Sequence, residues 1–330
     1  MGLLWDQHAC VALSVDTDIS ELRRYRRDDG GFVSINVGFA PHPFALSMAL
    51  LDSFRRQVTA VDGLTLVNSV EEIDTAAATG DTAVAFDLED SGPLAGDLGN
   101  VRLFVEKGVR TMLPTYNHAN AAGCGCLDTV DTGLTRWGHD LVAAMNEAGM
   151  VPDGSHCSTR TGLDMCAASS KPVVYSHSCM RGIWDHPRNI TDDQARACAD
   201  TGGVVGITGV GIFLGPNTPT LEAMTRHLEY AIGLVGVDHV GVSTDYSFDY
   251  LDFRTEIAQT PELFDESYTR WGPIEWMPPE RFLRLGAHLA ARGWADDDIR
   301  AVLGGNFRRV AQESWVGGSL THFVSAHSAE

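Results

Sequence analysis

Five residues of types that bind metal ions or transfer protons stand at or just past the end of a short apolar run: His8, Glu89, His156, His177 and Asp245. In a barrel of parallel strands, the carboxyl ends of all strands open onto one face, so residues far apart in the sequence converge there. Zinc and similar ions prefer imidazole, carboxylate and thiolate ligands, and catalytic sites leave one position open. We therefore expect one catalytic pocket, with the three histidines and Glu89 as metal ligands.

Two of the candidate residues leave alternatives open. Cys10 follows His8 by two positions on an extended segment, so both side chains face the same side, and Cys10 is either a further ligand or a bystander. Asp245 has the type and position of a proton-transfer group, but a helix N-cap or a solvated loop acid is the common alternative. A lone histidine is more often a hydrogen-bonded core residue than a ligand, whereas candidates at several strand ends together favour a metal site.

The pocket needs strands that carry these residues, and short apolar runs with strand character recur along the chain. Longer stretches with helical spacing of apolar residues lie between most of them. This alternation predicts parallel βαβ units that close into an α/β fold, the (β/α)8 or TIM barrel. The expected strands are residues 3–8, 32–37, 82–88, 109–114, 150–155, 172–176, 203–208 and 239–244, and the expected helices include 43–60, 94–106, 137–148, 191–200 and 221–235.

One domain, residues 1–330, is expected because no linker or block of charge divides the chain. Residues 247–278 interrupt the alternation and follow the last expected strand directly, where loops cover the catalytic mouth of a barrel. We interpret this segment as a lid or a substrate-facing insertion, with a dimer contact as the alternative. Residues 279–316 are expected to form C-terminal helices.

The charge and the cysteines limit the partners and the compartment. The 24 basic and 44 acidic residues give a formal net charge of −20, which disfavours nucleic acids and anionic membranes as partners. The odd number of cysteines, 7, includes the loop pair Cys124 and Cys126, and it favours a reducing cytoplasm. The first residues lack the features of a signal peptide, and no apolar stretch reaches the ~18 residues of a membrane span. We expect a soluble, cytoplasmic protein.

Other sequence motifs argue against several enzyme classes. The Cys124-Gly-Cys126 pair lacks a second pair of thiols, and the glycines around residue 211 have the spacing GxGxxxG rather than that of a dinucleotide-binding loop. The chain contains no GxSxG nucleophile elbow and no P-loop. Serine hydrolase and nucleotide triphosphatase activities are therefore not expected.

Longer segments of the chain resemble the membrane (renal) dipeptidase family, the M19 metallopeptidases of the amidohydrolase-like barrels. These segments follow one another in the order of the family and together span nearly the whole chain. They are residues 104–120, 133–158, 171–207, 227–249 and 302–310.

The resemblance implies a (β/α)8 barrel with a binuclear zinc site. By position, Glu89 would bridge two zinc ions, His8 would bind one ion, and His156 and His177 would bind the other. Asp245 would be the catalytic acid and base.

The resemblance also assigns substrate contacts. Arg188 matches the arginine that holds the terminal carboxylate of a dipeptide, a task that suits the planar guanidinium. Tyr116 and Asn117 lie in the segment that contacts the substrate near the reacting carbonyl, and Tyr116 replaces the histidine of the family there. The tyrosine can still donate one hydrogen bond to a developing oxyanion.

The first metal motif departs from the family pattern, because it reads His8-Ala9-Cys10 where the family has His-x-Asp. A thiolate would still hold zinc but would donate more charge to it, and the alternative is a weak or empty first site. One or two zinc ions are therefore expected.

These observations predict a zinc-dependent hydrolase of a small amide, most simply a dipeptide with a free carboxylate. One alternative is an amidohydrolase that acts on another small amide or a lactam. Another alternative is a catalytically impaired metal-binding barrel, against which the retention of Asp245 and Arg188 argues. A homodimer is the assembly that the resemblance implies.

Overall fold

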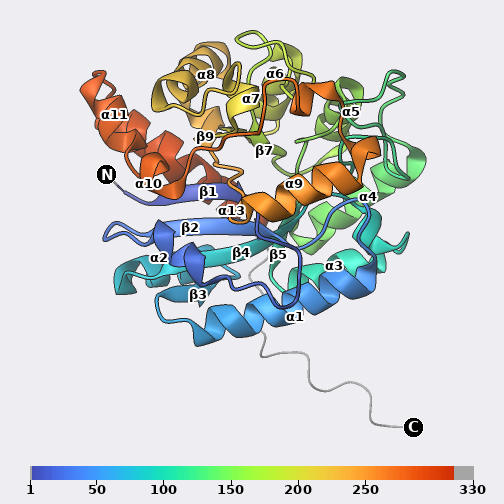
Figure 1. Cartoon of the computed structure of the whole chain (residues 1–330), viewed down its shortest axis with the longest axis horizontal. Helices are drawn as coiled ribbons and strands as arrows, with labels where there is room; N and C mark the ends of the chain where they lie inside the picture. Colours follow the sequence, from blue (N-terminus) through green and yellow to red (C-terminus); the bar gives the residue numbers. More distant parts are fainter. Residues whose placement is uncertain (1, 316–330) are drawn as a thin grey trace.

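Parallel strands alternate with helices along residues 2–315, the part of the chain that the computed structural model describes. Met1 and residues 316–330, which belong to the predicted domain and in part to its predicted C-terminal helices, lie outside the described residues. Figure 1 shows the strands at the centre, with helices around them. The strands are β1 (Leu4–Ala9), β2 (Gly31–Asn36), β3 (Leu64–Leu66), β4 (Thr82–Leu88), β5 (Val109–Met112), β6 (Val151–Pro152), β7 (Val174–Ser178), β8 (Val204–Ile207) and β9 (Val240–Val242).

Backbone pairing joins eight of these strands into a closed barrel. One sheet has the order β1-β2-β4-β5-β6, and the other has the order β7-β8-β9. A parallel bridge between Asp153 and Val174 connects β6 with β7. The backbone amide of Asp245 donates to the carbonyl of His8 at 2.9 Å, which connects the end of β9 with β1. The predicted (β/α)8 barrel is thereby confirmed.

Helices connect the strands and surround the barrel. The α-helices are α1 (Phe44–Ala60), α2 (Val70–Thr79), α3 (Gly99–Glu106), α4 (Arg136–Ala148), α5 (Thr159–Ala168), α6 (Asp192–Asp200), α7 (Gly211–Leu214), α8 (Leu221–Val235), α9 (Tyr250–Gln259), α10 (Pro279–Phe282), α11 (Leu285–Ala291), α12 (Asp296–Arg300) and α13 (Asn306–Ser314). Short 3-10 helices are η1 (Ser20–Tyr25), η2 (Gly92–Leu94), η3 (Val237–His239), η4 (Pro261–Leu263) and η5 (Glu266–Tyr268), and η6 (Ala301–Gly305) is a π-helical turn.

Local sequence explains where several helices begin and end. The Thr191 hydroxyl accepts the amide of Gln194, whose side chain accepts the amide of Thr191, so a capping box starts α6. The hydroxyl of Thr135 accepts the amide of Gly138 at the start of α4, and Gly149 ends this helix with a φ of 78°. Glycine adopts that left-handed conformation without the steric cost that other residues meet.

The predicted strands and helices all have counterparts in the structure, but one βα unit is additional. Strand β3 pairs with the first three residues of β4, whose last three residues pair with β5. Helix α2 follows β3. A strand of three residues is too short to show the alternation from which strands are predicted.

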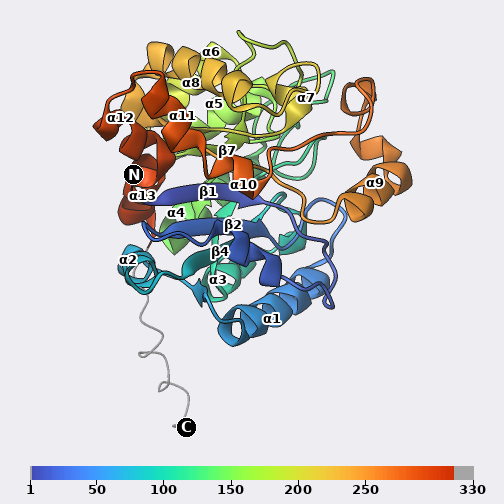
Figure 2. The same ribbon diagram turned by 60° about the vertical axis from the view of Figure 1, so that its left-hand side comes forward.

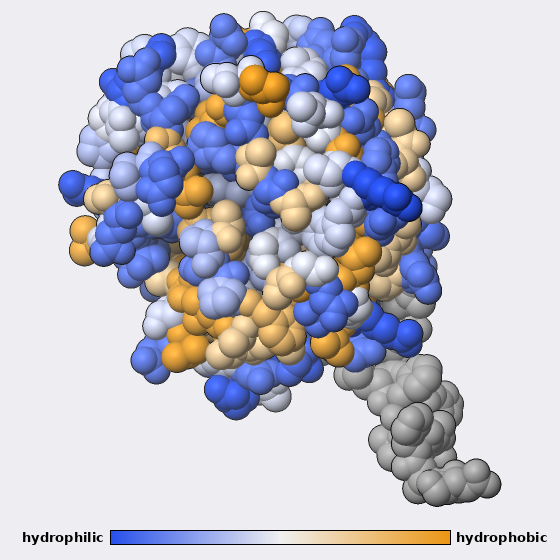
Figure 3. Space-filling model, turned by 90° about the vertical axis from the view of Figure 1, so that its right-hand side faces the viewer, coloured by the Kyte–Doolittle hydropathy of each residue, from blue (hydrophilic) through white to orange (hydrophobic). Residues whose placement is uncertain are grey.

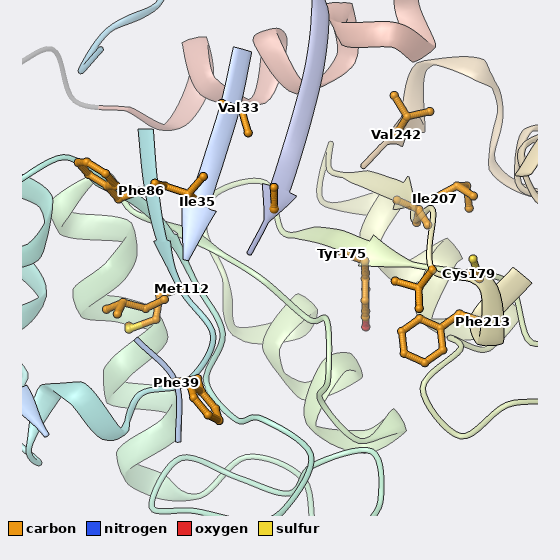
Figure 4. Close-up of a cluster of buried hydrophobic side chains, with 14 of the residues drawn as sticks. Val33, Ile35, Phe39, Phe86, Met112, Tyr175, Cys179, Ile207, Phe213 and Val242 are labelled. Atoms are coloured by element: carbon orange, nitrogen blue, oxygen red, sulfur yellow. The ribbon is translucent and has the colours of Figure 1, made fainter. Parts of the chain in front are cut away.

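Two apolar clusters stabilise the barrel. The larger one lies between the strands and the surrounding helices, and Figure 4 shows Val33, Ile35, Phe86 and Met112 among its side chains. The smaller cluster closes the amino end of the barrel interior, where the rings of Trp5 and Phe32 stack with centroids 3.8 Å apart. Residues of α2 and α13 complete this smaller cluster.

The barrel interior becomes polar towards the carboxyl ends of its strands. Alternate residues of a strand face the same side, so Phe32 at the amino end is followed on that side by Ser34 and Asn36. Both side chains are buried, and Ser34 donates a hydrogen bond of 2.5 Å to the carboxylate of Asp87 on β4. This polar layer is where the candidate site residues meet.

Residues 247–278, here named the α9 segment, extend over the polar end. They contain α9, η4 and η5. The backbone amide of Met277 in this segment donates to the carbonyl of Gly209 at 2.9 Å. Figure 2 shows α9 at one end of the molecule and α12 and α13 at the opposite end. The α9 segment therefore lies at the end of the barrel at which the strands terminate.

One face of the molecule is mainly polar. The face drawn in Figure 3 is mostly hydrophilic, with apolar residues gathered in its lower part. Among the described residues, no helix combines the length and the apolar character that a membrane crossing requires.

Candidate metal centre and catalytic site

The candidate residues lie at the carboxyl ends of five different strands. His8 is the penultimate residue of β1, Glu89 directly follows β4, and His177 lies in β7. His156 follows β6 in a loop, and Asp245 follows β9. The fold thus brings together the five residues that the sequence singled out.

One carboxylate oxygen is the centre of the cluster. Glu89 Oε1 lies 3.3 Å from His8 Nε2, 3.4 Å from His156 Nε2 and 3.3 Å from His177 Nε2. Asn36 donates a hydrogen bond of 2.5 Å to the other oxygen, Glu89 Oε2. Glu89 is therefore held so that one oxygen faces all three imidazoles.

The second nitrogen of each imidazole is held by a buried acceptor or hydroxyl. His8 Nδ1 lies 2.9 Å from Asp87 Oδ1, His156 Nδ1 lies 2.7 Å from Asn117 Oδ1, and His177 Nδ1 lies 2.6 Å from Ser176 Oγ. Such contacts fix the ring orientation and direct Nε2 towards a metal in known metal sites. Every ring is thus prepared to offer Nε2 to the same point.

The cluster fits a divalent metal ion by three further observations. His177 Nε2 is buried and has no hydrogen-bond partner among the described residues. The N···O distances of 3.3–3.4 Å match those of neighbouring ligands, because ligands ~2.0–2.1 Å from a tetrahedral zinc ion are ~3.3 Å apart. Ligand atoms of His8, Glu89 and His177 all lie within 4.8 Å of one another.

The protonation states of the three imidazoles also favour the binding of a cation at the cluster. Burial lowers the pKa of His156 to about 3, and burial with the nearby positive charge of His8 lowers that of His177 well below its usual value. Both imidazoles are therefore neutral, as metal binding requires. Burial opposes the charged form of His8 too, but Asp87 and Glu89 raise its pKa well above the ordinary value. Positive charge is thus stabilised where these carboxylates meet.

A second group of possible ligands adjoins the first. Cys10 Sγ lies 3.4 Å from His8 Nε2 and 3.6 Å from Asp245 Oδ1. These three residues also have ligand atoms within 4.8 Å of one another. The thiol of Cys10 therefore faces the same space as His8 and is not turned away from it.

Asp245 is held in an uncommon backbone conformation. Its φ is 50°, and His156 has a φ of 62°, although both are non-glycine residues. Asp6 accepts the backbone amide of Thr244 at 2.8 Å and the hydroxyl of Tyr25 at 2.6 Å, which fixes the residue before Asp245. Conformations of this kind persist where surrounding contacts impose them, and they concentrate at functional sites.

Burial makes the carboxyl group of Asp245 a weaker acid than an ordinary aspartate. Desolvation, with a further contribution from Glu89, raises the pKa of Asp245 to about 7, although His8 and Arg188 oppose this rise. A carboxyl group with such a pKa can both accept and donate a proton near neutral pH.

A cavity lies over the cluster. Asp245, Glu89, His156 and Tyr116 contribute to its wall, as does the α9 segment through Phe253 and other residues. About 680 Å³ there is not filled by protein atoms, a figure that includes open solvent, so the cavity is accessible from outside. The ring of Tyr116 stacks on that of His156 with centroids 4.1 Å apart.

Two residues that were predicted to contact substrate, Asn117 and Arg188, do not line this cavity. The Asn117 side chain is fully buried behind His156, and its amide group donates to the carbonyl of Leu263 at 2.8 Å. Arg188 is also buried and donates to the carbonyl of His177 at 2.9 Å. Asn117 is therefore placed to orient His156 and not to line this cavity. Arg188 lines a neighbouring polar cavity, which shares His156 with the first.

Several residues that support the site were not anticipated from the sequence. Asp87, Ser176 and Asn36 each contact a proposed ligand. Asp87 carried a usable signal, because it precedes Glu89 by two positions and the alternation of a strand places both on the same face. Ser176 and Asn36 carried none, since buried serine and asparagine residues are common at strand ends.

A comparison with protein families matches residues 6–272 to the model described as membrane dipeptidase, peptidase family M19. The chain is 33% identical over 196 residues to an uncharacterised Klebsiella pneumoniae protein from the pqqA 5' region, covering 56% of this chain and 72% of the relative. It is 29% identical over 251 residues to dipeptidase verJ of Clonostachys rogersoniana, covering 76% of this chain and 60% of that protein.

Solved structures share the fold. A crystal structure of an amidohydrolase from Pseudomonas aeruginosa superposes with a TM-score of 0.85 at 26% identity, covering 95% of this chain and 97% of that one.

Proposed function

From the premise that the chain belongs to the membrane dipeptidase family, peptidase family M19, and is a metal-dependent dipeptidase-like hydrolase, we propose that it binds one or two zinc ions and cleaves dipeptides with a free carboxylate. The observation that carries this proposal is the convergence of three imidazole Nε2 atoms on one oxygen of Glu89. Zinc is favoured over magnesium and calcium because the donors are mainly nitrogen and, at Cys10, sulfur.

His8, Glu89, His156 and His177 would hold the metal, with Cys10 as a further ligand of the ion at His8. Divalent ions at this site would supply a Lewis acid that polarises the amide carbonyl and lowers the pKa of water. The thiolate of Cys10 would take the place of the family carboxylate. Its distance of 3.4 Å from His8 Nε2 supports this assignment.

Asp245 would move the proton. It accepts the proton that the attacking water loses and delivers it to the amine that leaves. Its pKa of about 7 and its place in the cavity wall support this role.

Tyr116 and Arg188 would bind the substrate. The hydroxyl of Tyr116 would donate to the developing oxyanion, and burial raises the pKa of Tyr116 well above its usual value, which keeps this donor protonated. Arg188 would bind the terminal carboxylate through the neighbouring polar cavity. Its buried Nε has no hydrogen-bond partner among the described residues, which supports this contact.

The decisive experiment combines elemental analysis of protein purified without chelators with hydrolysis of a panel of L,L and L,D dipeptides. Stoichiometric zinc and dipeptide turnover, both removed by a chelator and restored by zinc, are expected. Zinc without turnover of any dipeptide would contradict the proposed substrate, and the absence of bound metal would contradict the proposed centre.

A second candidate function is the hydrolysis of another small amide or of a lactam. The specific observation in its favour is the combination of Cys10 with Tyr116 in the cavity wall, where the family pattern has a carboxylate and a histidine. Turnover of non-peptide amides or lactams by zinc-loaded protein that leaves every dipeptide intact would favour this candidate.

The seven cysteines support a reducing cytoplasmic location as part of the proposal. All seven are free thiols, including the partly buried Cys10 and Cys126. Thiols remain reduced in the cytoplasm, whereas oxidising compartments favour disulfides.

A further inference from the structure

The cavity over the candidate metal centre has an unusual balance of charge. Among the described residues that line it are four carboxylates and no lysine or arginine. Glu89 and Asp245 belong to the proposed catalytic machinery. The other two, Asp252 and Glu256, lie one helical turn apart on α9 and have no assigned role.

Glu256 has no cationic partner in the part of the chain that the structure describes. It takes part in no ion pair with an arginine, a lysine or a histidine there. Burial, together with the negative charges of Glu89 and of Asp252 on its own helix, raises the pKa of Glu256 to about 8. A cation placed beside this group would favour its ionised form. Two ionised carboxylates four residues apart on a helix repel each other, so Glu256 is mostly protonated near neutral pH when no cation is bound beside it.

Aromatic rings surround the same space. Phe39, Tyr116, Phe213, Phe253 and Trp276 contribute to the wall. Phe253 precedes Glu256 by three positions, and its ring packs against that of Trp276 with centroids 5.2 Å apart. Aromatic faces attract cations, and they also pack well against the methylene groups of a lysine or arginine side chain.

We propose that Glu256 selects dipeptides whose N-terminal residue has a basic side chain, with Asp252 as a second carboxylate near the cavity entrance. The inference rests on the proposed dipeptidase function. The stem of such a side chain would lie between the aromatic rings, and its cationic end would pair with Glu256. An apolar side chain would instead leave the half-buried carboxyl group of Glu256 without a partner. An acidic side chain would meet only acidic groups in the described part of the wall.

The location of Glu256 distinguishes a side chain from the α-ammonium group of the substrate. The α-nitrogen is only two bonds from the carbonyl carbon, which must reach the cluster around Glu89. Glu256 lies on α9 and not at the strand ends that carry the cluster, and its side chain takes part in no ion pair with the histidines of the described residues. A group that reaches Glu256 therefore extends away from the scissile bond.

The test compares kcat/KM of the zinc-loaded enzyme for three dipeptides with one common C-terminal residue. Their N-terminal residues are lysine, Nε-acetyl-lysine and norleucine, so that only the side-chain charge separates the first from two neutral analogues. We expect the lysine substrate to be preferred by at least ~10-fold, as a hydrogen bond to a charged group implies. Glu256→Gln should abolish this preference and leave the norleucine substrate nearly unaffected.

Matched variants separate the charge of Glu256 from general effects on α9. Glu262→Gln removes an exposed carboxylate of the same segment and should retain the lysine preference. Asp252→Asn should reduce the preference less than Glu256→Gln.

Each other outcome overturns a defined part of the proposal. Equal kcat/KM values for the three substrates in the wild-type enzyme would overturn the inference and leave the dipeptidase function intact. An equal loss for all three in Glu256→Gln would place the contact at the α-ammonium group and would also overturn it. Absence of turnover of every substrate would overturn the proposed function, and the inference with it.

Discussion

Asp245 combines three properties of a proton-transfer residue: a constrained backbone with φ of 50°, a place in the cavity wall and a pKa raised by burial to about 7. Its contacts with His8 and Cys10, both at 3.6 Å, leave the carboxylate close to the proposed metal ligands. Substitution of a proton-transfer residue lowers turnover but leaves the metal content unchanged, whereas substitution of a metal ligand lowers both.

Asp245→Asn is therefore expected to lower kcat by ~10²–10⁴-fold, the usual contribution of general acid–base catalysis. The amide preserves the shape of the side chain but cannot accept the proton. Steady-state kinetics with a dipeptide, alongside zinc analysis of the same preparation, tests this expectation. Full activity in the variant would remove Asp245 from the mechanism, and a loss of zinc would make it a ligand.

Whether Cys10 binds the metal can be tested directly, because a thiolate ligand has a spectroscopic signature. In cobalt-substituted protein, we expect an intense near-ultraviolet charge-transfer band from the thiolate, which Cys10→Ser should remove together with part of the bound metal. Cys126→Ser is the matched control, because Cys126 is the other partly buried thiol. Persistence of the band in Cys10→Ser would show that Cys10 is a bystander.

At the scale of elements, helix α6 follows the loop that carries Arg188, and its start depends on the capping box of Thr191 and Gln194. Thr191→Ala should lower the free energy of unfolding by ~1 kcal/mol, because it leaves a helix amide without its acceptor. Urea unfolding measures this change, and Thr191→Ser, which keeps the hydroxyl, should retain most of the stability. An unchanged midpoint in Thr191→Ala would contradict the importance of the cap.

The elements that carry the ligands could be predicted from sequence, because strand character and chain direction are local properties. Parallel strands all end on the same side, so the end of each apolar run marks a position near the site. The same reasoning correctly places His8, Glu89 and His177 together without knowledge of any contact. Strand lengths were less predictable: residues 150–155 were expected as a strand, but β6 comprises only Val151–Pro152.

The orientation of loop residues could not be predicted in this way. The side chain of Asn117 is buried and holds His156 in place of lining the cavity over the cluster. The buried guanidinium of Arg188 donates to the carbonyl of His177 and lines the neighbouring cavity, so its contact with substrate stays a prediction. These orientations depend on contacts between distant segments, such as the hydrogen bond from Asn117 to the carbonyl of Leu263. No local pattern in the sequence records such a contact.

For the molecule as a whole, the free energy of unfolding depends on pH through buried titratable side chains that lie outside the candidate site. His227 on α8 is fully buried and away from the candidate ligands in sequence. Its Nδ1 accepts the backbone amide of Met180 at 3.1 Å, and its Nε2 lies 3.3 Å from the carbonyl of Leu214. These contacts suit the neutral ring, and burial lowers the pKa of His227 to about 4.

This pKa has a defined consequence for unfolding. In the unfolded chain the pKa of His227 returns to ~6.5, so between pH 6.5 and pH 4 the unfolded state binds a proton that the folded state does not. The stability contributed by the neutral ring is complete above pH 6.5 and is lost as the pH falls towards 4, by up to ~3 kcal/mol.

His227→Gln cannot titrate, and its amide can replace both hydrogen bonds. We therefore expect urea unfolding of zinc-saturated protein at pH 7 and pH 4.5 to show a smaller loss of stability in the variant than in the wild type. Equal losses in the two proteins would contradict the assignment, because all other titrating groups are common to both.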